Sequence, residues 1–441
     1  MLNKVKYLRQ QSSFSQSGFS LVELMVGLVI GLIATLIIVQ TLSVFEGNKR
    51  STTGTADAQT NGNIGLYIVQ RELQFAGYGM PLVSGTMPEN ATPYGVTYLD
   101  NAALTDAQIE ANYDARKAAY AARVAADKAK VDAGYVFSAL KCSISPDSNF
   151  DADNDASTPD ILKSKVIDPV TVTNGVGGAS DTIAIRYGDT TRGALPTNID
   201  ATPAIAPSIT VGNNLGCRPG DVVLIANSVN NATGNAACFI TKTTSTLAEL
   251  TNVPHNTLKL ASLAGVNTAA DPAQRVSCLG RVRETTFSVG NGANANQLLK
   301  NGVPVIGEIV SLQAQYGISS SPNSEIVALP DPDDPVDPFR INSWVNATGV
   351  WQNPPNTGAV CNAITANRNC IKAVRIAIVA RNNLLESTAV SQACNGAAAT
   401  ARVCAFGQNI AFANADWQNY RYRVYEVVVP LRNILAATPQ L

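Results

Sequence analysis

The most regular hydrophobic pattern in the chain is an apolar run near its N-terminus, from Leu21 to Val39. Within this run Glu23 is the one ionisable residue. A helix needs about 20 apolar residues to cross a bilayer, so the run predicts a membrane-spanning helix. The residues before it are basic, with Lys4, Lys6 and Arg9 and no acid, which predicts that the N-terminus stays in the cytoplasm.

A cleavable secretory signal peptide is the main alternative for this run. Its apolar region is shorter, roughly 7–15 residues, and a cleavage site with small residues follows it. Here the run is longer, and residues 40–44 read QTLSV, which is a poor cleavage site. We therefore expect the apolar helix to be kept.

Helical spacing of apolar residues resumes after the membrane segment. Ser, Thr and Gly residues around 51–55 predict a break or kink near Gly54. Beyond it, the apolar positions fall on one helical face and end at Gly77 and Gly79. This second half is expected to lay that face on a globular domain. The apolar positions of the face are Ile64, Tyr67, Ile68 and Phe75.

The remainder of the chain has a different pattern, with short runs of β-branched and aromatic residues between Gly, Pro and Asn. These runs predict a β-rich region, and Pro330–Pro338 predicts a surface loop or linker. The fold class is therefore α+β: a long hydrophobic N-terminal helix followed by a β-rich globular domain. The predicted strands are Thr182–Tyr187, Val222–Ala226, Cys238–Thr241, Thr257–Leu260, Val282–Val289, Val305–Tyr316, Ile371–Ala380 and Tyr422–Val429.

Two segments before these strands have unusual composition. Residues 101–135 are rich in alanine and charge, which predicts an exposed helical insertion, with a partner-binding arm as the alternative. A second segment alternates acids in the manner of the first half of a calcium loop. It departs from an EF-hand at Ala156 and Leu162, so a solvated acidic loop is the alternative. The calcium candidates are Asp151, Asp153, Asp155, Ser157 and Asp160.

The charge and the cysteine content bear on the binding partners of the protein and on its cellular compartment. The chain of 441 residues has a formal net charge of −1, and no cluster of Lys and Arg predicts nucleic-acid binding. Its eight cysteines all follow the apolar run, which predicts an oxidising compartment and disulfides. Zinc binding is the alternative, but no C-x-x-C occurs and His255 is the single histidine.

Sequence cannot fix the connectivity of these cysteines. Pairing nearest neighbours gives Cys217–Cys238, Cys361–Cys370 and Cys394–Cys404. This scheme leaves Cys142 to pair with Cys278.

Little in the sequence indicates an enzyme or a cofactor. A Ser-His-Asp or Cys-His arrangement would need His255, which lies in a polar, turn-like setting. No G-x-S-x-G, Walker or dinucleotide motif is present. Carboxylate pairs for glycoside hydrolysis stay open, because they need only meet in space. Trp344 and Trp351 could form a sugar platform, although Trp in a β domain is more often part of the core or its rim.

Gly18-Phe19-Ser20-Leu21-Val22-Glu23 resembles the class III signal of type IV prepilins. The resemblance implies cleavage between Gly18 and Phe19 by a prepilin peptidase, followed by methylation of the Phe19 amine. It also implies domain limits: a leader over 1–18, an assembly helix over 19–79, and a periplasmic or extracellular region over 80–441. A carboxylate inside an apolar helix is costly, and pairing Glu23 with the Phe19 ammonium of a neighbouring helix would offset that cost. The alternative is an ordinary signal anchor with a chance acid.

The globular part adds a second resemblance, to the PilW family of minor pilins. Four segments carry it, at residues 217–225, 310–317, 371–379 and 422–433. The family implies a pilin-like fold and a minor pilin that primes assembly of the type IV pilus and joins its tip complex. It connects the chain with twitching motility and cell adhesion. The alternatives are a pilus-associated adhesin, a type II secretion pseudopilin, or a membrane-anchored hydrolase.

The same resemblance implies the partners and the location of the protein. The expected partners are other minor pilins (PilV, PilX and FimU/E-type), a PilY-type tip protein and the major pilin. The expected location is the inner membrane, crossed once with the globular domain in the periplasm, and then the pilus on the cell surface. No catalytic residue and no nucleic-acid partner is expected, and calcium is the one cofactor considered.

Overall fold

The structure is a computed structural model in which part of the chain is described. The leader with Gly18 and Phe19, the alanine-rich insertion, the acidic segment and Pro330–Pro338 lie outside the described residues. By contacts the chain forms two compact units, Met1–Ala56 and Asp57–Leu441. The described residues are 20–80, 142–144, 166–190, 197–199, 208–226, 236–261, 263, 275–320, 340–354, 361–396 and 400–435.

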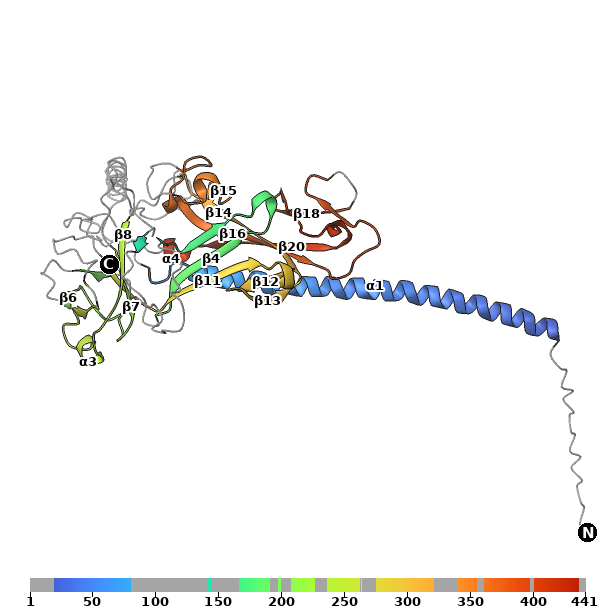
Figure 1. Ribbon diagram of the computed structural model, residues 1–441, viewed down its shortest axis with the longest axis horizontal. Helices are drawn as coiled ribbons and strands as arrows, with labels where there is room; N and C mark the ends of the chain where they lie inside the picture. The colour runs from blue at the N-terminus through green and yellow to red at the C-terminus, as the bar shows by residue number, and fades with distance from the viewer. Residues whose placement is uncertain are drawn as a thin grey trace, which may run out of the picture. The chain divides into compact units, whose positions relative to one another are not determined.

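The first element is a single helix, α1, that runs from Leu21 to Phe75 (Figure 1). It continues without a break through Gly54, so the predicted interruption there is wrong. Among the described helices it is the one long and apolar enough to cross a membrane. In its apolar part the hydroxyl groups of Thr35 and Thr41 donate to the carbonyls four residues earlier, which satisfies polar groups that lipid could not.

The second half of α1 packs through small residues rather than through its large apolar ones. Tyr67 is 61% exposed and Ile64 and Phe75 are also exposed, so the predicted buried face is wrong, apart from the partly buried Ile68. The helix and the sheet approach each other closely, which explains the difference. A Cβ atom added at Gly62 would lie 2.3 Å from the ring of Tyr425. Small residues let the backbone reach the sheet, and large ones are left outside. The buried residues of α1 are Ala58, Gly62, Gly65, Val69, Glu72 and Leu73.

Two antiparallel sheets form one core with this helix, and we call this part the sheet lobe. The five-stranded sheet has the order β13-β12-β11-β4-β3 and the four-stranded sheet the order β15-β14-β16-β20. Val69 and Leu73 of α1 join apolar residues of both sheets in this core. The strands are β3 (Val170–Thr173), β4 (Thr182–Gly188), β11 (Val282–Val289), β12 (Gln297–Lys300), β13 (Val303–Gly307), β14 (Ile309–Ile318), β15 (Ser343–Val345), β16 (Ile371–Arg381) and β20 (Tyr422–Pro430).

One predicted strand of the sheet lobe is divided in the structure. The segment Val305–Tyr316 was expected to be continuous, but it is split between β13 and β14. The break is at Glu308, whose φ of 57° lies in the left-handed region. Its carboxylate accepts hydrogen bonds from Arg381. Because Arg381 is distant in sequence, the residues around Glu308 do not predict this contact.

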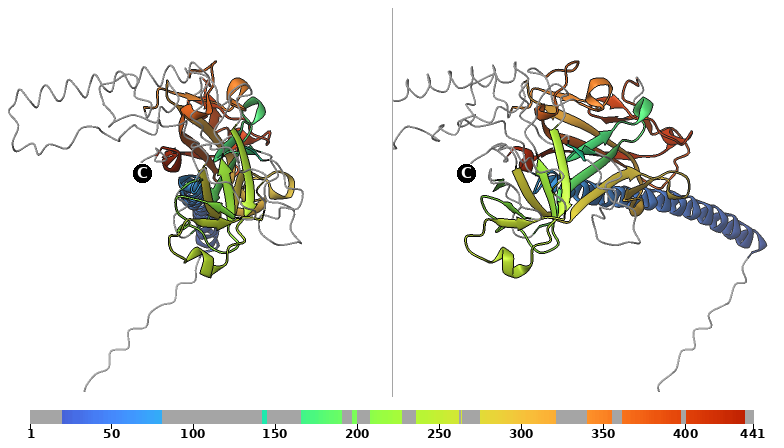
Figure 2. Two further views of the ribbon diagram at one scale, coloured as in Figure 1. Left: turned by 90° about the vertical axis from the view of Figure 1, so that its left-hand side faces the viewer. Right: turned by 60° about the vertical axis from the view of Figure 1, so that its left-hand side comes forward.

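A second set of strands closes into a small barrel with its own core. The antiparallel pairs are joined into a ring by two bridges, Ile199 to Val211 and Thr243 to Leu260. Figure 2 shows these yellow-green strands side by side. The helix α3 (Leu247–Leu250) lies between two of the barrel strands in the sequence. The barrel strands are β5 (Thr197–Asn198), β6 (Ser208–Thr210), β7 (Val222–Ala226), β8 (Ala236–Lys242), β9 (Thr257–Lys259) and β10 (Arg275–Gly280).

Strand β7 is shared between the two cores. Val223 and Ile225 belong to the barrel core, whereas Val222 and Leu224 belong to the core of the sheet lobe. A strand buried on both faces reads as an unbroken apolar run, which is why Val222–Ala226 carries no polar residue. The alternation of a half-buried strand is absent here for the same reason.

The remaining elements are short. A third small core lies between β16 and the segment that contains β18, with Ala377, Val379 and Val403 among its buried residues. These elements are β1 (Cys142–Ile144), β2 (Val166–Ile167), β17 (Ser391–Ala393), β18 (Ala401–Ala405), β19 (Gln408–Asn409), α4 (Arg432–Leu435), and the 3-10 turns Val176–Gly178, Gly292–Asn294, Gly349–Trp351, Arg368–Cys370 and Trp417–Asn419.

The described disulfides agree with nearest-neighbour pairing in two places and contradict it in a third. Cys361 pairs with Cys370, and Cys394 pairs with Cys404. Cys217 pairs with Cys278, so the predicted bonds Cys217–Cys238 and Cys142–Cys278 are both wrong. Cys217 precedes β7 and Cys278 lies on β10, which pairs with β7, so the sheet brings together residues that are distant in sequence. The side chains of Cys142 and Cys238 lie outside the described set.

Candidate functional site

The first half of α1 presents an uncovered apolar surface. Its large apolar side chains from Leu21 to Phe45 are each between 52% and 76% exposed. Exposed area of this size is unfavourable in water, so lipid or other apolar helices must cover it. Glu23 lies in the first turn, where a negative charge interacts favourably with the helix dipole. Among the described residues, Glu23 has no ion-pair partner.

The second half of α1 is held to the sheet lobe by a polar contact at Glu72. This carboxylate is buried, and Lys300 Nζ donates to its Oε1 at 2.5 Å while the Tyr187 hydroxyl donates to its Oε2 at 3.0 Å. The rings of Phe75 and Tyr187 lie 5.6 Å apart beside this contact. Burial, together with the neighbouring Glu72 carboxylate, raises the pKa of Tyr187. The charge of Glu72 is thus compensated within the fold, whereas Glu23 has no such partner among the described residues.

The C-terminal end of α1 receives a cap from the far end of the chain. The side-chain amide of Asn433 donates to the carbonyls of Gln74 at 3.1 Å and Ala76 at 3.2 Å. These belong to the last helical turn and its exit, where carbonyls lack partners within a helix. Gly77 then takes a positive φ of 74° and its amide donates to the carbonyl of Arg186. Helix, β4 and the C-terminal segment therefore meet at one joint.

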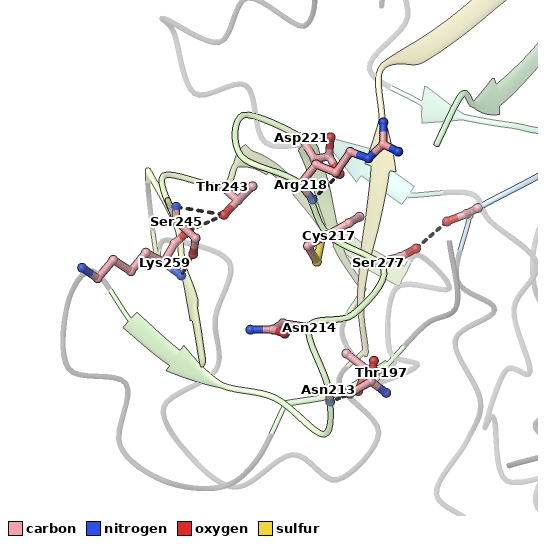
Figure 3. Close-up of a disulfide and its surroundings, with 12 residues drawn as sticks. Thr197, Asn213, Asn214, Cys217, Arg218, Asp221, Thr243, Ser245, Lys259 and Ser277 are labelled. Carbon is pink, nitrogen blue, oxygen red and sulfur yellow. Dashed lines mark hydrogen bonds between the residues drawn. A yellow bond between two sulfur atoms is a disulfide. The ribbon is translucent and has the colours of Figure 1, made fainter. Parts of the chain in front are cut away.

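The barrel end of the molecule holds an internal polar network around its disulfide (Figure 3). The Cα atoms of Cys217 and Cys278 are 5.2 Å apart. The buried Asn214 donates to the carbonyl of Thr257 at 2.7 Å, and the Thr243 hydroxyl donates to the carbonyl of Lys259 at 2.9 Å. These bonds connect the segments that follow β6 and β8 to strand β9, so the network holds both segments in place.

The residues considered for catalysis and sugar binding do not form a common site. His255 follows the cis peptide Val253–Pro254 in a turn, and its Nδ1 lies 3.2 Å from the carbonyl of Leu250. Trp351 is buried and donates to the carbonyl of Asn362, so it offers no platform. Trp344 is half-buried, with the guanidinium of Arg375 4.8 Å from its ring centre. No metal-binding group of His, Cys, Asp or Glu was found in the described part of the chain.

Comparison with protein families matches two parts of the chain. The family described as type IV pilus-assembly protein W matches residues 276–433, and the prokaryotic N-terminal methylation motif matches residues 13–39. The chain thus carries a PilW-family domain behind a type IV prepilin methylation motif. The PilW match runs from β10 to the capping residue Asn433, so it includes the four-stranded sheet, whereas β5 to β9 of the barrel precede it. The searches of curated proteins and of solved structures returned no match.

The sequence predicted the apolar helix and its methylation motif, but not the contact at Glu72 that holds the helix to the PilW-family domain. Glu23 is described, whereas Gly18 and Phe19 are not. The buried positions of α1 could have been suspected from the spacing of its small residues, since Ala58, Gly62 and Gly65 recur at intervals of three and four. Glu72 lies on the same face of α1, but no sequence pattern indicated that this acid would be buried.

Proposed function

We propose that the chain is a minor pilin that primes assembly of a type IV pilus and is incorporated in its tip complex. The observation that carries the proposal is the uncovered apolar half of α1, with its single acid, on a helix whose other half is packed into a folded domain. Such a helix first needs lipid around it and then the helices of other subunits. The family match to a pilus-assembly protein supports the same assignment.

The N-terminal processing follows from the methylation motif at residues 13–39. In this proposal a prepilin peptidase cuts between Gly18 and Phe19 and the new Phe19 amine is methylated. Mass spectrometry of the purified protein tests the step directly. A methylated Phe19 start supports it, whereas an intact leader, or a cut after the apolar run, contradicts it.

Glu23 then serves as the assembly carboxylate. Inside a bundle of apolar helices, an unpaired carboxylate and an unpaired ammonium both carry a large desolvation cost, which their pairing offsets. Glu23→Ala is therefore expected to abolish or strongly reduce piliation. Glu46→Ala is the matched control, because Glu46 lies on the same helix, is exposed, and interacts with Arg50 in the same chain at 3.7 Å. Wild-type piliation with Glu23→Ala would count against the proposal.

The location and partners follow from the same assembly route. The protein would cross the inner membrane once, with its N-terminus in the cytoplasm and its domain in the periplasm, and would then move to the pilus. Other minor pilins of the PilV, PilX and FimU/E types, a PilY-type tip protein and the major pilin would be its partners. Removing the globular domain separates priming from adhesion: lost piliation supports priming, whereas intact pili with lost attachment would indicate an adhesin.

A further inference from the structure

Strand β20 differs sharply from the strand beside it. It pairs with β16 along its whole length and forms the edge of the four-stranded sheet. In β16 every residue except Arg375 is buried, whereas in β20 Val429 alone is buried. The last strand of this sheet therefore has one edge paired with β16, and most of its side chains are half-buried or exposed.

The hydrogen bonds at both ends of the pair show which backbone groups face outward. The amide of Leu431 donates to the carbonyl of Lys372, and the amide of Asn382 donates to the carbonyl of Arg421. Because hydrogen-bonded pairs alternate along an antiparallel ladder, the even-numbered residues of β20 direct their N–H and C=O groups away from β16. Among the described residues, no backbone hydrogen bond joins these groups to another strand. They belong to Tyr422, Val424, Glu426 and Val428.

The other edges of the two sheets are short or interrupted. Strand β13 carries Pro304, which cannot donate, and its register with β12 shifts between Leu298 and Leu299. Strands β15 and β3 are three and four residues long, whereas β20 has nine residues and a proline only at its last position. Proline, irregular register and shortness are among the features that protect edges from pairing, as are charged side chains such as Arg423 and Glu426 of β20. Among the described edges of the sheet lobe, β20 is the one without the first three.

We propose that the outer edge of β20 binds an extended strand from a neighbouring pilus subunit. The inference rests on the proposed function. A row of free N–H and C=O groups recognises an extended backbone, and it adds that segment to the sheet. Val428, 46% exposed at this edge, provides an apolar contact for a side chain of the incoming strand.

The position of the edge beside the helix favours a pilus subunit as the source of that strand. Tyr425 of β20 packs directly on Gly62 of α1. A subunit whose own helix packs along the second half of α1, near Gly62, would be held close to β20, and this raises the effective concentration of its strands there. Helix packing between two subunits would thus favour strand pairing between them.

Photocrosslinking of the full chain in piliated cells tests this partner. Benzoylphenylalanine placed at Val428 is expected to form an adduct with a strand of another pilin subunit, identified by mass spectrometry of the linked peptides. The matched control is the same group at Val303, which is 62% exposed on the edge strand β13 and is expected to give no such adduct. Absence of an adduct at 428, or an adduct only with a second copy of this chain, would overturn the proposal.

Substitutions at the same two positions give a second, functional readout. Val428→Lys places a charge on the edge, and Val428→Pro removes one outward N–H group. Val428→Pro should reduce piliation about fivefold to tenfold, the loss expected from one backbone hydrogen bond. Val428→Lys should also reduce piliation, because the incoming strand would bury its charge, while Val303→Lys leaves piliation unchanged. Unchanged thermal unfolding of the variants shows that the fold is kept.

The two proposals fail in different ways. Wild-type piliation with the Val428 variants, alongside a defect with Glu23→Ala, overturns strand pairing and leaves the pilin role in place. Wild-type piliation with Glu23→Ala overturns the pilin role itself.

Discussion

The sheet lobe and the barrel reach a closed core by different means. The barrel strands form a ring, so the barrel core is enclosed by its own strands and one disulfide. The sheet lobe has open sheets and takes Val69 and Leu73 from α1 into its core. A ring needs no outside element to cover it, whereas the core of the sheet lobe depends on residues of α1. Substitutions in α1 should therefore destabilise the sheet lobe and not the barrel.

The largest effect is expected from the barrel disulfide. Replacing Cys217 and Cys278 by serine opens a loop with a sequence separation of 61 residues, against 10 for Cys394 and Cys404. On chain-entropy grounds the losses are about 4 and about 3 kcal/mol. Hydrogen-exchange mass spectrometry should show faster exchange in β6 and β9 while β14 and β16 stay protected. Equal exchange in both regions would mean that the two cores unfold as one.

The converse effect is expected from the helix. Leu73→Ala removes a fully buried side chain and should cost about 3 kcal/mol, with faster exchange in the sheet lobe. Tyr67→Ala is the matched control, because this ring is largely exposed and should change stability by less than about 0.5 kcal/mol. Thermal unfolding of the full chain in detergent measures both. A larger loss with Tyr67→Ala would reverse the assignment of the buried face.

The sheet lobe should also respond to pH through a buried acid. Asp181 accepts hydrogen bonds from the amides of Gly175 and Ala314, and burial raises its pKa from 3.8 to about 6. The folded state then binds the proton more tightly than the unfolded chain, so this contribution to stability falls as pH rises from about 4 to 6, by at most about 3 kcal/mol.

Asp181→Asn provides the measurement, through unfolding free energies taken across that pH range. The variant should lose the downward slope that Asp181 gives to the sheet lobe. A wild-type slope in the variant would show that another group titrates there.

The smallest effect is expected at the contact between helix and sheet. Glu72→Gln leaves Lys300 without its charged partner and should cost about 1–2 kcal/mol, because Lys300 is partly exposed and water compensates it. Glu46→Gln, at an exposed pair on the same helix, should cost less than about 0.5 kcal/mol. Denaturant unfolding compares the two, and equal costs would argue that Glu72 does not fasten the helix.

Sequence predicted the features that depend on neighbours along the chain. The apolar helix is present, and Val282–Val289 was predicted with the limits that β11 has. What was missed depends on partners far away in the chain. The phase of the second half of α1 is set by Tyr425, and the break at Glu308 faces Arg381. Strand pairing of β7 with β10, rather than closeness in sequence, decides the partner of Cys217.

The cap that Asn433 provides to α1 has a consequence for biosynthesis. The helix is synthesised before the amide that completes its last turn, which follows 357 residues after Ala76. Contacts between such remote positions form slowly, because a long loop must close first. During synthesis the last turn of α1 therefore stays without this cap until Asn433 has been made and has reached it.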